Sequence, residues 1–191
     1  MKPILQVDDD PNDVFLLHHA LKKVGVANPI QIASDGQQAI DYLRGAGKFA
    51  DRTKYPLPCL VLLDLKLPYV MGLDVLRWIR QQPGTRWVVI MLTASGEDAD
   101  IATAYRLGAN GFLTKPSQAG KLEDMVKAIK DFWLTHNTLP QESHPEAAAS
   151  GLRRARTTAF AAKPPAAVNG RAVKSETTPR KKNEKNHRIT F

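Results

Sequence analysis

Short apolar runs alternate five times with segments in which apolar residues recur every three or four positions. This alternation constrains the fold more than any other feature of the chain. The apolar runs have the length of strands and lie at residues 4–7, 30–33, 59–63, 87–92 and 111–113. The helical spacing of apolar residues predicts helices within residues 14–24, 39–43, 73–79, 101–107 and 122–133. A repeat of strand and helix predicts a parallel sheet with helical crossovers.

Right-handed crossovers place helices on both faces of such a sheet. The sequence therefore predicts an α/β fold with a doubly wound, five-stranded parallel sheet in the flavodoxin-like order 2-1-3-4-5. Ligands in these folds bind beyond the carboxyl ends of the strands. The polar residues at those ends are thus the first candidates for function.

Charge divides the 191 residues into two parts. Residues 1–139 carry 16 Lys/Arg and 15 Asp/Glu, whereas residues 140–191 carry 11 and 4. The second part holds six large apolar residues, Leu152, Phe160, Val168, Val173, Ile189 and Phe191. Six are too few to build a core for 52 residues. We therefore expect a domain at residues 1–139 and a basic, disordered tail at residues 140–191.

Several classes of protein are excluded by composition. No apolar run approaches the roughly 20 residues that span a bilayer. Cys59 is the only cysteine, so an internal disulfide cannot form, and three carboxylates precede any apolar stretch of secretory length. We expect a cytoplasmic protein that does not act in a membrane.

The ends of four expected strands carry polar side chains. The acidic residues 8–10 follow the first strand, Asp64 follows the third, Thr93 ends the fourth and Lys115 follows the fifth. Carboxylates about 5 Å apart repel by roughly 3 kcal/mol per pair at an effective dielectric of 20, which favours a bound cation, Mg²⁺ by preference. Lys115 and Thr93 would cradle a phosphoryl group on one carboxylate. Asp64 is the best acceptor, because it stands alone after a wholly apolar strand.

Four spaced motifs, ILQVDDD, LVLLDLKLP, IMLTAS and GANGFLTKP, resemble those of the receiver domain of bacterial two-component response regulators. The resemblance covers residues 3–134. It implies that Asp64 accepts a phosphoryl group from a sensor histidine kinase and that the protein is a signalling phosphoacceptor, not an enzyme in the usual sense. By the same resemblance, the protein would assist its own phosphorylation and dephosphorylation.

The resemblance also implies a ligand set. Asp9, Asp64 and the backbone carbonyl of Lys66 would coordinate Mg²⁺, and Asp8 would join through water. Thr93 and Lys115 would bind phosphate oxygens.

Two further features follow from the same resemblance. Phe112 would be the switch residue whose rotamer changes on phosphorylation, and the bond before Pro116 would be cis. Homodimerisation or partner binding would use the face formed by residues 101–107, 111–113 and 122–133.

Within the family, the stretch YLRGAGKFADRTKYPLPCLVLLDLKLP resembles the phytochrome-associated response regulators, as do RWIRQQPGTRW and IKDFWL. Two features depart from the family pattern. Met71 stands before Gly72 where an acidic residue is usual, and the basic tail is an addition. The position of Met71 lies outside the metal-binding set.

Other interpretations remain open at this stage. A phosphohydrolase with an aspartyl nucleophile typically has a general-acid carboxylate two residues later, where this chain has Lys66. A regulator whose tail contacts nucleic acid or another polyanion is an alternative, although 52 residues without helix-turn-helix periodicity support only non-specific contact. A pseudo-receiver, meaning a receiver-like domain that is no longer phosphorylated, is disfavoured because the acidic residues, Thr93 and Lys115 are all present. Asp10 and Asp13 fit helix-capping or first-turn charges, and His18 and His19 fit solvated positions.

Overall fold

Five parallel strands form the centre of the computed structural model, which describes residues 1–84, 87–94 and 96–138. They are β1 (Ile4–Val7), β2 (Ile30–Ala33), β3 (Leu60–Asp64), β4 (Val88–Thr93) and β5 (Gly111–Thr114). All pair in parallel in one sheet of order β2-β1-β3-β4-β5. The predicted fold class and strand order are confirmed, with strand ends within one residue of the expected positions.

Five α-helices follow the strands: α1 (Pro11–Lys23), α2 (Gly36–Arg44), α3 (Gly72–Gln81), α4 (Asp98–Leu107) and α5 (Ala119–Ile129). A 3₁₀ turn (Gly47–Phe49) follows α2, and a π-helical segment (Lys130–His136) continues α5. The helices begin one to three residues earlier than apolar spacing predicts, because residues before the first apolar position also belong to each helix. In α1 and α2 a side chain caps the start. Asp10 caps α1 by accepting a hydrogen bond from the Asn12 amide, and Asp35 caps α2 in the same way.

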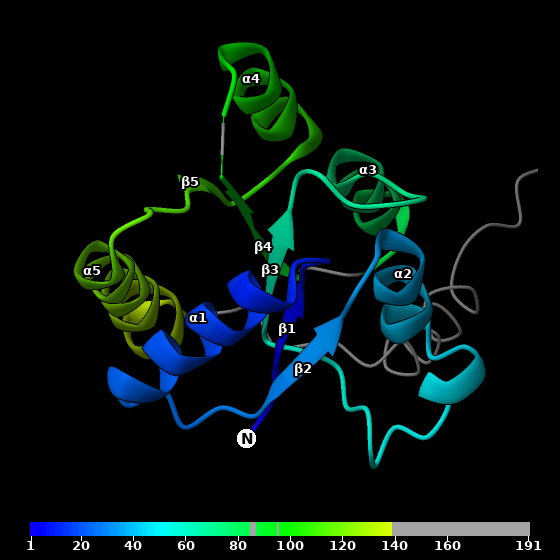
Figure 1. Ribbon diagram of the computed structural model, residues 1–191. Helices are drawn as coiled ribbons and strands as arrows, with labels where there is room; N and C mark the ends of the chain where they lie inside the picture. The colour runs from blue at the N-terminus through cyan, green and yellow to red at the C-terminus, as the bar shows by residue number, and fades with distance from the viewer. Residues whose placement is uncertain (85–86, 95, 139–191) are drawn as a thin grey trace, which may run out of the picture. The chain divides into compact units, whose positions relative to one another are not determined.

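The helices cover both faces of the sheet, as Figure 1 shows. One core cluster joins α1 and α5 to the face that carries Ile4, Leu60 and Leu62, while the other joins α2, α3 and α4 to the face that carries Leu5 and Val7. Every residue of β1, β3 and β4 is buried, as expected for central strands of a sheet covered on both sides. The edge strand β2 leaves Ile32 45% exposed.

The long connection from α2 to β3 is held by one arginine. The Arg52 guanidinium donates hydrogen bonds to the carbonyl oxygens of Tyr42, Leu43 and Tyr55. Two of these carbonyls belong to the last turn of α2, and that of Tyr42 also accepts a hydrogen bond from the Gly45 amide at 3.2 Å. Gly45, with a left-handed φ of 73°, ends the helix, and Arg52 ties the following loop to it. The Tyr42 hydroxyl adds a bond to the Pro56 carbonyl at 2.7 Å.

Within the described residues, no helix is long and apolar enough to cross a bilayer. Residues 139–191 lie outside the described part of the chain. The domain boundary at residue 139 and the disordered tail at residues 140–191 therefore stay predictions.

Candidate functional site

The carboxyl ends of β1, β3, β4 and β5 bring Asp8, Asp64, Thr93 and Lys115 to one edge of the sheet. Asp8 directly follows β1, and Asp64 is the last residue of β3. The backbone amide of Lys115 donates to the Thr93 carbonyl at 2.7 Å, which fixes the start of the β5–α5 loop beside the end of β4. Thr93 itself is buried. The parallel topology thus assembles residues that are far apart in the sequence.

The Lys115 ammonium lies at the centre of this edge. Its Nζ is 2.8 Å from Asp8 Oδ2, 2.8 Å from Asp64 Oδ2 and 2.9 Å from Asp13 Oδ2. An ammonium group has three hydrogen-bond donors, so these three carboxylates use all of them. Lys115 is therefore a fixed positive charge between β1, β3 and the first turn of α1.

Burial and charge oppose each other at this cluster. Burial raises the pKa of Asp8 above its ordinary value, and the hydrogen bond and charge of Lys115 offset part of that rise. Burial would lower the pKa of Lys115, but its hydrogen bonds to Asp64, Asp8 and Asp13 outweigh burial and raise that pKa above its usual range. Lys115 is therefore protonated at neutral pH.

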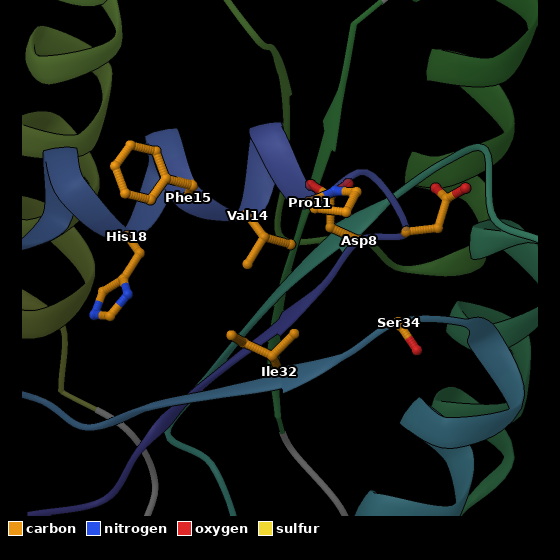
Figure 2. A pocket seen from close by; sticks show the side chains of 8 residues that line it. Asp8, Pro11, Val14, Phe15, His18, Ile32 and Ser34 are labelled. Atoms are coloured by element: carbon orange, nitrogen blue, oxygen red, sulfur yellow. The ribbon is translucent and has the colours of Figure 1, made fainter.

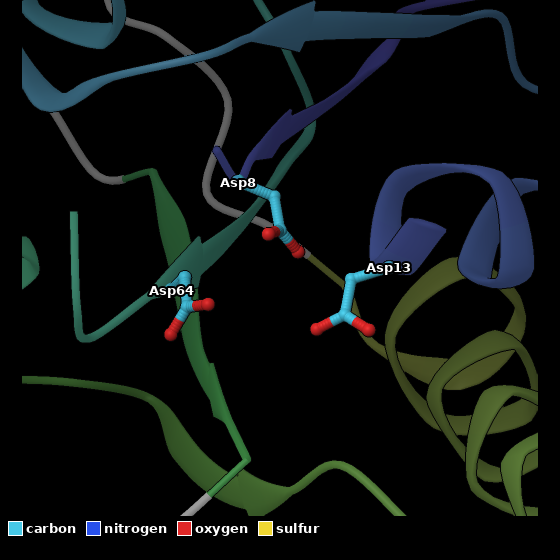
Figure 3. Close-up of side chains that lie close together, drawn as sticks. All are labelled: Asp8, Asp13 and Asp64. Carbon is cyan, nitrogen blue, oxygen red and sulfur yellow. The ribbon is translucent and has the colours of Figure 1, made fainter. Parts of the chain in front are cut away.

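The three carboxylates form a group that could hold a metal ion. One oxygen from each of Asp8, Asp13 and Asp64 lies within 4.8 Å of the other two, and Figure 3 shows the three side chains pointing toward one another. With all groups ionised, three carboxylates and one ammonium leave a formal charge of −2. Hard oxygen ligands with this charge match a divalent cation such as Mg²⁺, whose bound oxygens lie at about 2.0–2.1 Å.

The aspartates that gather at the site are not the same set that the sequence analysis predicts, because Asp13 belongs to the group and Asp9 does not. Asp10 caps α1 as expected, and Asp13 occupies its first turn as expected. Asp13 also reaches Lys115, a contact that the sequence analysis missed. Asp9 is exposed and does not belong to the group formed by Asp8, Asp13 and Asp64. Its role as a metal ligand stays a prediction.

Lys66 follows β3 by two residues, and Phe112 lies in β5. The Lys66 amide donates to Asp64 Oδ1 at 3.3 Å, while the predicted role of its carbonyl stays a prediction. Phe112 is half-buried and packs against the core on the α3 and α4 side. Its role as a switch likewise stays a prediction.

The bond before Pro116 is trans, so the expected cis bond is wrong. Trans is the form that an X–Pro bond favours, by about 0.5–1 kcal/mol.

A groove of about 350 Å³ adjoins the acidic cluster between α1 and β2, as Figure 2 shows. It is lined by Asp8, Asp9, Pro11, Val14, Phe15, His18, Ile32 and Ser34. Phe15 is 67% exposed there. His18 lies at this groove and is exposed, in agreement with the expected solvated position.

Comparison with known proteins decides the family. The family model of the response regulator receiver domain matches residues 4–127. The chain belongs to this family. A response regulator of this kind is a signalling protein and not a classical enzyme, which removes the phosphohydrolase interpretation.

Phytochrome-associated response regulators are among the similar proteins. Response regulator Rcp1 of Synechocystis sp. is 36% identical over 140 residues, covering 73% of this chain and 93% of Rcp1. The crystal structure of Mn²⁺-bound Rcp1 matches with a TM-score of 0.66 at 37% identity, over 73% of this chain and 99% of that one. The phosphorylated cyanobacterial phytochrome response regulator RcpA matches with a TM-score of 0.68 at 36% identity and the same coverage.

The departure at Met71 has a structural place in the receiver domain. Met71 is the N-cap residue of α3, and its side chain makes no capping hydrogen bond. A cap with a carboxylate or amide would accept a hydrogen bond from the first turn of the helix. Met71 thus leaves the N-cap of α3 without a side-chain acceptor, and its apolar side chain is 46% exposed.

Proposed function

We propose that this receiver domain accepts a phosphoryl group on Asp64 from a sensor histidine kinase, in a reaction that requires Mg²⁺. The observation that carries the proposal is the Lys115 ammonium, which lies 2.8 Å from both Asp8 and Asp64 at the carboxyl edge of the sheet. A carboxylate acceptor beside a fixed cation, with a second carboxylate available to a metal, is an arrangement suited to phosphoryl transfer.

Asp64 is a better acceptor than Asp8. The Asp8 side chain is 4% exposed, against 12% for Asp64. Burial also raises the pKa of Asp8, which lowers its readiness to act as an anion. In the proposed step an Asp64 carboxylate oxygen attacks phosphorus, the bond between phosphorus and the kinase histidine nitrogen breaks, and an acyl phosphate forms. The proton that the leaving imidazole requires comes from solvent.

Mg²⁺ would be held by Asp64 and Asp8, with Asp9 and the Lys66 carbonyl as the further ligands that the family resemblance implies. The gathered carboxylates and their formal charge of −2 after pairing with Lys115 fit a divalent ion. The Mn²⁺-bound form of Rcp1 supports the choice of a divalent metal. Bound there, the ion would offset the charge of the incoming phosphoryl group.

Phosphorylation would act on partners through Thr93 and Phe112. The Thr93 hydroxyl would turn toward the phosphoryl group, and Phe112 would respond by repacking against α4. The surface affected is the face of α4, β5 and α5, which we propose for homodimerisation or partner binding. Similarity to the cyanobacterial phytochrome response regulator RcpA supports a phytochrome-type sensor as the source of the signal, in the cytoplasm.

The test is incubation of the full chain with acetyl phosphate and Mg²⁺, followed by phosphate-affinity electrophoresis. Wild type should give a retarded band that is absent in EDTA and absent in Asp64→Asn. Asp10→Asn is the matched control, because Asp10 serves the N-cap of α1, where asparagine is equally suitable. A retarded band that persists in Asp64→Asn would overturn the assignment.

A further inference from the structure

Asp13 is the third carboxylate partner of the Lys115 ammonium, and unlike Asp8 and Asp64 it does not lie at the end of a strand. It lies in the first turn of α1, with its Oδ2 2.9 Å from Lys115 Nζ. The Asp13 side chain is 34% exposed, whereas those of Asp8 and Asp64 are 4% and 12% exposed. The contact with Asp13 is thus the solvent-facing one of the three.

A phosphoryl group on Asp64 would bind the Lys115 ammonium, whose hydrogen-bond donors are all in use in the resting site. The three donors of Lys115 are taken by Asp8, Asp13 and Asp64. A phosphoryl oxygen can bind Lys115 only after one of these hydrogen bonds is given up or lengthened. The strength of the hydrogen bonds between Lys115 and the three carboxylates therefore affects the affinity for the phosphoryl group.

The bond to Asp13 is the easiest to release. Asp8 is almost wholly buried, and a buried carboxylate left without its partner is costly. Asp13 can return to solvent, and its negative charge is also stabilised by the N-terminus of α1 when Lys115 leaves. A partly exposed ion pair is weak because water screens it.

We propose that Asp13 is a positioning residue that holds Lys115 in the resting site and competes with the phosphoryl group for it. This inference rests on the proposed function of Asp64. It deepens that function, because it makes the solvent-facing carboxylate of α1 a regulator of how firmly the phosphorylated state is bound. Removing the charge of Asp13 should weaken one of the three contacts of Lys115 and strengthen binding of a phosphoryl group.

The experiment measures binding of beryllium fluoride, a non-transferable mimic of a phosphoryl group on a carboxylate, to the full chain at saturating Mg²⁺. Asp13→Asn should bind it about two- to fivefold more tightly than wild type, as expected for weakening of one partly exposed ion pair. Asp13→Glu keeps the charge and should bind like wild type. Asp10→Asn removes a charge from the same end of α1 without a Lys115 contact and should also bind like wild type.

A double-mutant cycle distinguishes an effect through Lys115 from direct repulsion between Asp13 and the ligand. In the Lys115→Met background, Asp13→Asn should change the affinity by less than about twofold. A gain as large as in wild type would overturn the positioning role. Equal binding by Asp13→Asn and Asp10→Asn would also overturn it, and so would a greater than tenfold loss of Mg²⁺ affinity in Asp13→Asn, which would make Asp13 a metal ligand.

The two proposals fail in different ways. If wild type binds no beryllium fluoride and takes no phosphoryl group from acetyl phosphate, the proposed function of Asp64 is wrong. If wild type does both and Asp13→Asn leaves the affinity unchanged, only the role of Asp13 is wrong.

Discussion

The ring of Phe112 lies directly against the backbone of Gly96. A Cβ placed on Gly96 would be 2.9 Å from Phe112 Cε1 and 3.4 Å from its Cζ. The first distance is shorter than real Cβ contacts allow, so any other residue at position 96 would compete with the ring for space. The absence of a side chain at position 96, in the loop between β4 and α4, thus permits the observed position of Phe112.

Gly96→Ala should therefore displace the Phe112 ring without blocking phosphorylation of Asp64. The contact is with the far end of a side chain, which can rotate, so we expect a loss of less than about 1 kcal/mol in the free energy of unfolding. Side-chain NMR signals of Phe112 should shift in the unphosphorylated protein. Gly120→Ala is the control, because its Cβ would meet nothing within 4 Å. Unchanged Phe112 signals in Gly96→Ala would contradict the steric argument.

Met71→Asn should stabilise the receiver domain. The N-cap of α3 has an extended backbone, with φ −65° and ψ 152°, but no side-chain acceptor. Asparagine would supply that acceptor without adding charge near Asp64, and a cap of this kind contributes about 1 kcal/mol. Urea unfolding should show a higher midpoint with an unchanged slope. Met71→Ala is the comparison, since alanine cannot cap. A midpoint no higher in Met71→Asn than in Met71→Ala would show that position 71 cannot act as a cap.

Tyr42 should make stability fall at high pH. Burial raises the pKa of Tyr42 from 10.0 to about 12. Between these values the unfolded chain has lost the proton and the folded chain keeps it, so the free energy of unfolding decreases as pH rises from about 10 to 12. Wild type should lose more stability than Tyr42→Phe across this window, measured by denaturant unfolding at several pH values. Tyr105→Phe, at an exposed site, should follow wild type.

The sequence predicts the fold well because its strands are nearly uninterrupted apolar runs and its helices have clear apolar faces. It locates Asp8, Asp64, Thr93 and Lys115 at one edge because parallel strands end together. It misses the contact of Asp13 with Lys115. That contact depends on where the first turn of α1 lies relative to the sheet and on the length of the Lys115 side chain, which follows β5. The periodicity of apolar residues indicates neither.

Helix boundaries show a similar limit. The start of α1 at Pro11 follows from Asp10 as a cap, which the sequence does indicate. The connection after α2 contains no periodic pattern, so the three hydrogen bonds of Arg52 could not be anticipated. Pairing of a guanidinium with carbonyls that end a helix becomes apparent only once the loop has folded back on α2.

The last prediction concerns the basic part of the chain, residues 140–191, with 11 Lys/Arg and 4 Asp/Glu. A chain ending at residue 139 should keep Mg²⁺ binding and Asp64 phosphorylation, because every residue of the proposed site lies at or before Lys115.

The full chain should bind heparin, whereas the shortened chain should bind it at least tenfold more weakly at low salt. Because contact through lysine and arginine displaces counterions, the affinity of the full chain should fall steeply as salt rises. Loss of Asp64 phosphorylation on shortening would place part of the receiver domain beyond residue 139. Equal heparin binding by the two chains would show that the basic residues there do not act as a polycation.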